Sequence, residues 1–173
     1  MIRSIFMFFI SSCILQPATA QDAGAFTSAR RVYSDASEWK IYTSDGDVFW
    51  HRDFTDGSQW SLEADGKQYT LSRTYGDGSE WRLQTPEGTV TLKRSYSDGS
   101  AWEIKDEVGS YTVRRTFADG SDWSVSGPNG GMALHRAFSD GSQWNLNDSF
   151  DEASVYVKAM MVFVVIAPHH PRN

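Results

Sequence analysis

A tryptophan recurs at a fixed step of 21 residues along most of this 173-residue chain, and an arginine keeps the same step eight positions earlier. Between the two lies an Asp-Gly-Ser sequence in five units and Asp35-Ala36-Ser37 in the first unit. A fixed period of this length is typical of repeat architectures, in which each repeat is one small structural unit. The tryptophans are Trp39, Trp60, Trp81, Trp102, Trp123 and Trp144, and the arginines are Arg31, Arg52, Arg73, Arg94, Arg115 and Arg136.

Each unit is predicted to form a β-hairpin. In the fourth unit Leu92 and Arg94 alternate with polar residues, and so do Trp102 and Ile104, which is the period of two expected for strands. The Ser-Asp-Gly sequence between them predicts a three-residue loop, a type I turn that ends in a left-handed glycine. This loop places Arg94 opposite Trp102 and Leu92 opposite Ile104. A two-residue Asp-Gly loop would divide the apolar residues between two faces.

A second tight turn joins each unit to the next, so that Leu62 is predicted to face Tyr69. The fold class predicted is therefore all-β, an antiparallel meander of about twelve strands from six 21-residue hairpin repeats. One face carries Trp, Leu, Ile, Val, Tyr, Phe and Arg, with Tyr96 expected opposite Ser100 on that face. Because such a face cannot stay in water, we expect a rolled or closed sheet. The sequence leaves a barrel and an open superhelix as alternatives.

The repeated tryptophans and arginines are the candidate binding residues, because both fall on the same face. One interpretation is a structural ladder in which each guanidinium stacks on the opposite indole, such as Arg94 on Trp102. The charged tip would then reach a turn aspartate, Asp98 or Asp77 for Arg94. The other interpretation is a solvent-facing groove in which Trp39, Trp60, Trp81, Trp102, Trp123 and Trp144 with Arg31, Arg52, Arg73, Arg94, Arg115 and Arg136 bind a ligand.

The remaining polar residues do not form a recognisable catalytic or metal site. The turn aspartates repeat with the same period, but each unit offers one carboxylate whereas calcium needs six to eight oxygens. His51 and His135 fall at outward positions that other units fill with Ser, Lys or Arg. No phosphate-binding loop, nucleophile elbow or His-Glu-x-x-His sequence is present. We therefore predict a non-enzymatic protein with no cofactor and no metal.

The ends of the chain differ from the repeat region. Residues 1–20 resemble a signal peptide, with Arg3, an apolar stretch and Ala18-Thr19-Ala20 as the cleavage site; a lipid anchor on Cys13 is the alternative. We expect a flexible lead at 21–30 and a six-hairpin repeat domain at 31–150. An apolar capping segment and a disordered tail are expected at 151–173, with 155–167 as a strand or helix over the open end of the sheet. A membrane or lipid-anchor signal in that segment is the lesser alternative.

Net charge and cysteine content limit which partners and which covalent cross-links are expected. Without Arg3 the chain has 15 basic and 22 acidic residues, a net charge of −7, which argues against nucleic acid and anionic membranes. Cys13 is the only cysteine, so a processed chain would fold without disulfides. Together with the signal-like residues 1–20, these features predict a secreted or periplasmic protein after cleavage near Ala20.

The segments Tyr75–Trp81 and Phe117–Trp123 resemble the aromatic-x-Asp-Gly-Ser-x-aromatic core of MORN repeats. The resemblance covers about a third of each unit; the unit is shorter here, and the Gly-x-Gly of that family is missing. It implies hairpins that stack into an elongated sheet and act as a scaffold or adaptor. The aromatic hairpins are also similar to choline-binding cell-wall repeats. The function expected is a structural or protein-interaction scaffold; the alternative is a glycan or cell-wall binding module using Trp, Arg and Tyr clusters.

Overall fold

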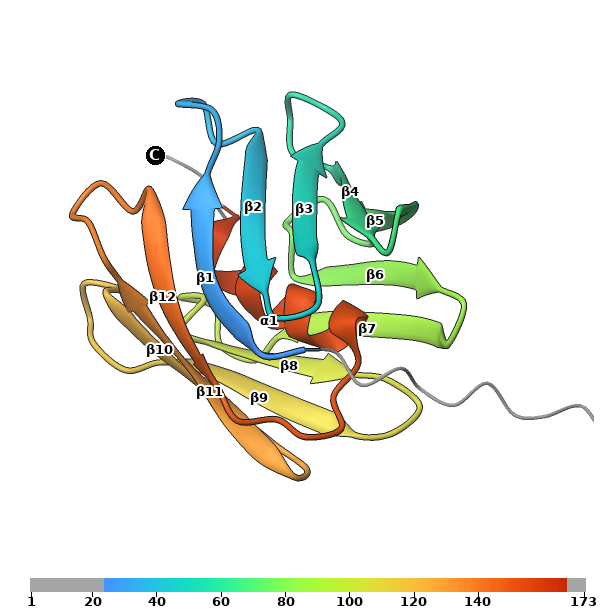
Figure 1. The fold of residues 1–173 in the computed structure, drawn as a ribbon. Helices are drawn as coiled ribbons and strands as arrows, with labels where there is room; N and C mark the ends of the chain where they lie inside the picture. Colours follow the sequence, from blue (N-terminus) through green and yellow to red (C-terminus); the bar gives the residue numbers. More distant parts are fainter. Residues whose placement is uncertain (1–23, 168–173) are drawn as a thin grey trace, which may run out of the picture.

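The computed structural model describes residues 24–167, which form twelve strands and one helix. Each strand pairs antiparallel with its neighbours in the chain, and β1 pairs with β12, so that the sheet closes into a barrel (Figure 1). The predicted all-β meander of six hairpins is confirmed, and the closed alternative is the one observed. The strands are β1 (Phe26–Arg31), β2 (Glu38–Thr43), β3 (Asp47–Arg52), β4 (Gln59–Ala64), β5 (Lys67–Arg73), β6 (Glu80–Thr85), β7 (Gly88–Arg94), β8 (Ala101–Lys105), β9 (Ser110–Arg115), β10 (Asp122–Gly127), β11 (Gly130–Arg136) and β12 (Gln143–Asp148).

The predicted register is confirmed. Arg94 pairs with Trp102 and Leu92 with Ile104 across β7 and β8. At the loop between these strands, the Gly99 N–H donates to the Tyr96 carbonyl at 3.0 Å, and Gly99 has φ +69°. This is the type I turn with a left-handed glycine that the sequence indicated, and it fixes which side chains face the barrel interior.

Two predictions about the ends of the domain need correction. Strand β1 begins at Phe26, so the segment 21–30 is not a flexible lead over its second half. Its backbone bonds to both β2 and β12, because barrel closure gives this short, weakly apolar segment a partner on each side. Phe26 and Ala29 are buried, with a register shift between Phe26 and Ser28. The predicted signal peptide at 1–20 lies outside the described residues.

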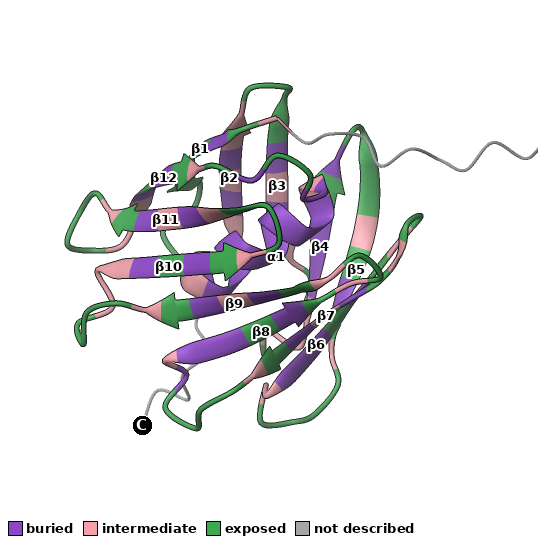
Figure 2. Ribbon diagram, turned by 90° about the horizontal axis from the view of Figure 1, so that it is seen from below, coloured by how far each residue is buried: buried purple, intermediate pink, exposed green. Residues whose placement is uncertain are grey.

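The second correction concerns 155–167, which we expected to cover the open end of the sheet. It forms α1 (Val155–Ile166), which lies inside the barrel and is enclosed by the strands (Figures 1 and 2). Apart from Lys158, the helix is apolar around its circumference, and a helix of that kind is stable only when it is buried on all sides. Ten of its twelve residues are buried. No helix in the described part of the chain is long and apolar enough to cross a membrane.

Aromatic contacts join the helix to the wall. The Phe163 ring lies 4.9 Å from the Trp50 ring, 5.5 Å from Trp60 and 5.4 Å from Trp81, centroid to centroid. The Trp50 indole also donates to the Ala159 carbonyl at 3.1 Å. These tilted and edge-on ring pairs add to the free energy gained by burial of their apolar surface. They fix both the depth and the rotation of α1.

A buried ion pair anchors the same helix to the last strand. Lys158 Nζ lies 3.0 Å from Asp148 Oδ2, and both side chains are about 1% exposed. Lys158 also donates to the Phe150 carbonyl at 3.1 Å. Asp148 accepts from the backbone N–H groups of Phe26 and Phe150, at 3.1 and 3.0 Å. One carboxylate therefore joins β1, β12 and α1, and each charge has the partners that burial demands.

We expect Lys158→Met to lower the free energy of unfolding by about 3–5 kcal/mol, because it leaves the Asp148 carboxylate buried and unpaired. Asp148→Asn should have a similar cost, and the double variant should lose clearly less than the sum of the two. Urea unfolding followed by tryptophan fluorescence measures all three. Lys40→Met, which breaks the exposed Lys40–Asp47 pair, is the control and should have little effect. Additive losses at Lys158 and Asp148 would contradict the coupling.

Candidate functional site

Arginine–aspartate pairs form a closed ring at one end of the barrel. The six Asp-Gly-Ser or Asp-Ala-Ser loops surround this end, and we call it the crown mouth. Each arginine reaches the turn aspartate of the preceding unit, and Arg31 closes the ring by reaching Asp140 at 3.0 Å. For Arg94 the partner is Asp77, at 3.2 Å, whereas Asp98 pairs with Arg115. The other pairs are Arg52–Asp35, Arg73–Asp56 and Arg136–Asp119, at 3.1–3.5 Å.

The loops hold the aspartates in place. In every loop the serine two residues further on donates its backbone N–H to aspartate Oδ1, at 2.9–3.0 Å. Hydrogen bonds from Ser100, with a smaller contribution from the Arg115 charge, lower the pKa of Asp98 below its usual value near 3.8. The same causes lower the pKa of Asp35, Asp56, Asp77, Asp119 and Asp140. These carboxylates therefore hold the turns and the arginine–aspartate ring together.

The repeated tryptophans lie inside the ring and are buried, with 1–8% of each residue exposed. Trp81, Trp102 and Trp123 donate their indole N–H groups to the glycine carbonyl of their own loop, at 3.0–3.2 Å. The Arg94 guanidinium lies 5.9 Å from the Trp102 ring centroid, the stacked arrangement that the sequence suggested for this pair. The structure thus brings the twelve candidate residues together at the crown mouth, with the tryptophans buried and the arginines paired with turn aspartates.

One prediction about side-chain direction was wrong. The Tyr or Phe two residues after each repeat arginine does not join the apolar inner face, because the strand ends at or beside the arginine and the aromatic residue begins the turn. Each of these rings is 54–59% exposed. We call the set the aromatic crown: Tyr33, Phe54, Tyr75, Tyr96, Phe117 and Phe138. The same 21-residue step could have revealed it, but period-two alternation placed Tyr96 on the inner face.

The crown mouth is hollowed between its loops. A hollow of about 770 Å³ lies at the junction of the first and last hairpins, lined by Arg31, Trp39, Trp144 and Val165 among others. A second hollow of about 520 Å³ includes Trp60, Trp81 and Ala167. Val165 and Ile166 of α1 therefore line the first hollow, and Ala167, directly after the helix, lines the second.

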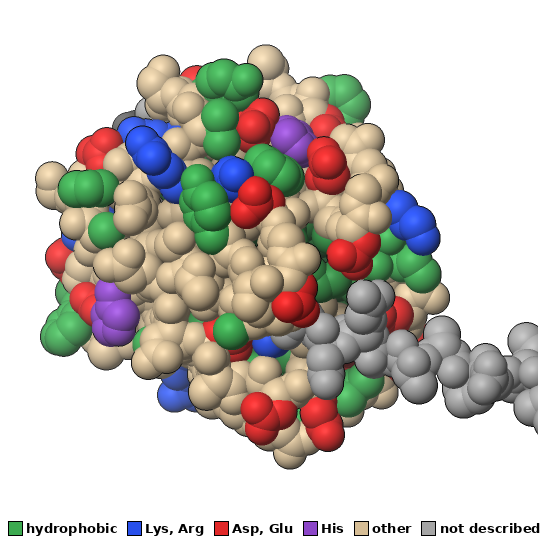
Figure 3. Space-filling view, viewed as in Figure 1, with side chains coloured by type: hydrophobic (Ala, Val, Ile, Leu, Met, Phe, Trp, Pro, Cys, Tyr) green, Lys and Arg blue, Asp and Glu red, His purple; other side chains and the backbone are tan. Residues whose placement is uncertain are grey.

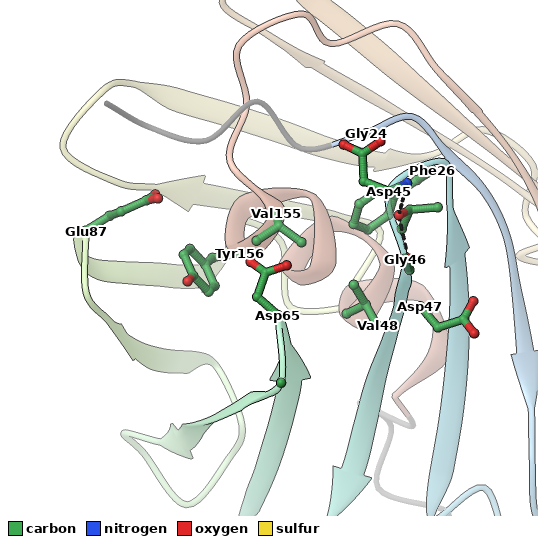
Figure 4. Close-up of a pocket in the computed structure, with 12 residues that line it drawn as sticks. Gly24, Phe26, Asp45, Gly46, Asp47, Val48, Asp65, Glu87, Val155 and Tyr156 are labelled. Atoms are coloured by element: carbon green, nitrogen blue, oxygen red, sulfur yellow. Dashed lines mark hydrogen bonds between the residues drawn. The ribbon is translucent and has the colours of Figure 1, made fainter. Parts of the chain in front are cut away.

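The opposite mouth has a different character. A hollow of about 290 Å³ lies there beside the start of α1, and Figure 4 shows Asp65 and Glu87 on separate loops around Val155 and Tyr156. Burial raises the pKa of Glu87, and the Asp106 and Asp65 charges add to this effect, against a hydrogen bond from Ser154. Burial likewise raises the pKa of Tyr156. Negative charge gathers at this mouth without an arginine ring to balance it.

The face of the molecule seen in Figure 3 is mostly polar, with scattered charges of both signs and several hydrophobic side chains. His51 lies 3.2 Å from Glu38 and 3.6 Å from Glu63, and His135 contacts Asp122. Hydrogen bonds from Ser121 and His135 lower the pKa of Asp122. Among residues 24–167, no three or more His, Cys, Asp and Glu side chains are grouped closely enough to hold a metal ion.

Comparison with known proteins gives no relative: no family model, no curated protein and no solved structure matches the chain.

The aspartate ring predicts a sign for pH dependence. A carboxyl whose pKa is lower in the folded state stabilises the fold above its unfolded pKa, near 3.9, and loses that contribution as pH falls through the folded value. We expect Asp98→Asn to reduce by up to about one the number of protons taken up on unfolding at pH 2–4. Urea unfolding at pH 2–7 measures this number. Asp151→Asn, outside the ring, is the control, and an equal slope for the two variants would contradict the assignment.

Proposed function

We propose that this protein is an exported, non-enzymatic scaffold that binds a protein partner through the aromatic crown. The observation that supports this is the exposure of six Tyr or Phe rings, 54–59% each, at one end of the molecule. Exposed aromatic side chains are the residues that most often supply binding energy in protein interfaces. The crown loops are roughly 10 Å apart, since each hairpin spans two strand spacings of about 4.8 Å.

The crown rings have little to do for the fold. The flanking loop positions vary freely: Ser97 follows Tyr96, whereas Gly76 follows Tyr75 and Ala118 follows Phe117. The aromatic position holds only Tyr or Phe in six of six units, although each of these residues is more than half exposed. A turn of this type accepts most residues at its first position. We infer that binding, rather than packing, keeps an aromatic ring there.

Two further features support a scaffold. The charged groups of the crown mouth are paired with one another in a ring, which leaves the rim close to neutral and favours apolar contact. The helix and the indoles fill the barrel, so the wall that carries the loops is stiff. A stiff support lowers the entropy cost of ordering the loops when a partner binds.

The test compares three immobilised proteins: the unaltered chain, a crown variant with Tyr33, Tyr75 and Phe117 changed to Ser, and a control. The control is Val108→Ser, which removes a 72% exposed apolar side chain at the opposite mouth. We expect the crown variant to bind a captured partner at least about 100-fold more weakly, since each lost ring removes about 1 kcal/mol or more. Circular dichroism verifies that the fold is kept. Equal binding by all three proteins would rule out the crown as the contact surface.

The second candidate function is glycan binding, because exposed aromatic faces also stack on sugar rings. The burial of the tryptophans means that such a site would use crown rings rather than Trp39 to Trp144. We expect acrylamide to quench tryptophan emission weakly in the free protein, and cellulose, chitin or peptidoglycan fragments to leave that quenching unchanged. Protection of tryptophan from strong quenching by one of these glycans would favour the module with tryptophan in its site.

A further inference from the structure

The seam of the barrel, where β1 meets β12, departs from the repeat. Trp39 is 3% exposed and its indole Nε1 has no hydrogen-bond acceptor among the residues described, whereas Trp81, Trp102 and Trp123 donate to their own loops. Ala36 stands where the other units have glycine, in the left-handed conformation at φ +56°. Buried N–H groups almost always have an acceptor, so this indole N–H is a donor that a bound molecule can use.

The hollow beside Trp39 has the size of a small-molecule site. Its volume is about 770 Å³, within the range of roughly 300–1,000 Å³ common for ligand pockets, which often lie in the mouths of barrels. Trp39, Trp144 and the half-buried Val165 supply apolar surface. It also holds hydrogen-bond donors, because Arg31 and Arg52 each use one nitrogen, Nη2, on an aspartate and direct no other side-chain hydrogen bond to the residues described.

The charges around the hollow indicate which kind of ligand it would bind. Three arginines and three aspartates line the hollow, so they balance. The last carbonyl groups of α1 end at its floor, beside Val165 and Ile166, and the C-terminus of a helix disfavours anions. The chain as a whole carries a net charge of −6. An uncharged ligand with an apolar body and a hydrogen-bond acceptor meets all three conditions.

We propose that the seam hollow is a binding site for a small uncharged molecule with an apolar body and a carbonyl-type acceptor, which Trp39 Nε1 and neighbouring guanidinium N–H groups hold. The indole N–H is buried in the free protein, so the proposed contact requires the loop that carries Ala36 to shift when the ligand enters. The apolar body rests on Trp144 and Val165. This site is separate from the crown rings and does not depend on their function.

The experiment titrates the full ¹⁵N-labelled chain with N-butylhexanamide and follows the indole N–H signals by NMR. We expect the Trp39 signal to move downfield and saturate. Trp39→Phe keeps the ring but removes the donor, and should weaken binding about fivefold, the effect of one neutral hydrogen bond. Trp123→Phe removes a donor already paired with Gly120 and is the control, with unchanged affinity.

Three outcomes would overturn the proposal. The first is no saturable shift of the Trp39 signal, or equal affinity for the Trp39→Phe variant. The second is binding of decanoate, an anion of similar length, as tight as that of the amide. The third is binding only to a chain shortened to end at Ala167, which would mean that the protein's own C-terminal residues occupy the hollow. Decanoate binding at least tenfold weaker than the amide, together with a response of the full chain, supports the uncharged ligand.

Discussion

The lumen of a twelve-stranded barrel has to be filled, and the rest of this structure depends on that constraint. About eight strands enclose a space that their own side chains fill, whereas sixteen or more leave a channel. Twelve strands fall between these cases, so even seven inward tryptophans leave room along the axis. Helix α1 occupies that room, and Phe163 reaches three indoles at once. The helix therefore fills the space inside the wall, and the wall shields the apolar helix from water.

The repeat made most of the wall predictable from sequence. A period of 21 residues, with Trp102 eight positions after Arg94, fixes strand number, pairing and register, because a slip by one residue would turn every indole outward. The position of α1 was not predictable in the same way, since an apolar segment gives the same pattern over an opening as within a lumen. The start of β1 was missed because its burial comes from β12, a partner more than a hundred residues away. The exposure of Tyr96 was missed because alternation continues in the sequence after the strand has ended.

The two mouths of the barrel differ in the charges that lie nearest to helix α1. Helix α1 begins at the acidic mouth, near Asp65 and Glu87, and ends at the mouth that carries the arginine ring. Both placements suit the helix dipole, whose amino end attracts negative charge and whose carboxyl end attracts positive charge. The guanidiniums lie toward the interior, with side chains 17–25% exposed, and the aspartates toward solvent, at 57–61%. The rim therefore stays near neutral to an approaching partner while its inner layer favours the end of the helix.

Comparing equivalent residues of the six hairpins also helps to distinguish residues kept for packing from residues kept for binding. Six copies of one hairpin experience almost the same surroundings, so a residue kept in every copy for packing should be buried, as Trp102 and Arg94 largely are. Tyr96 and its equivalents are kept yet exposed, which packing does not explain. The buried Trp39, with its unpaired N–H, and the half-buried Ala36 show the reverse, because they depart from the other copies. Because the seam is the one junction whose two hairpins come from opposite ends of the chain, it is also the place where one copy can change without disturbing the register of the other five.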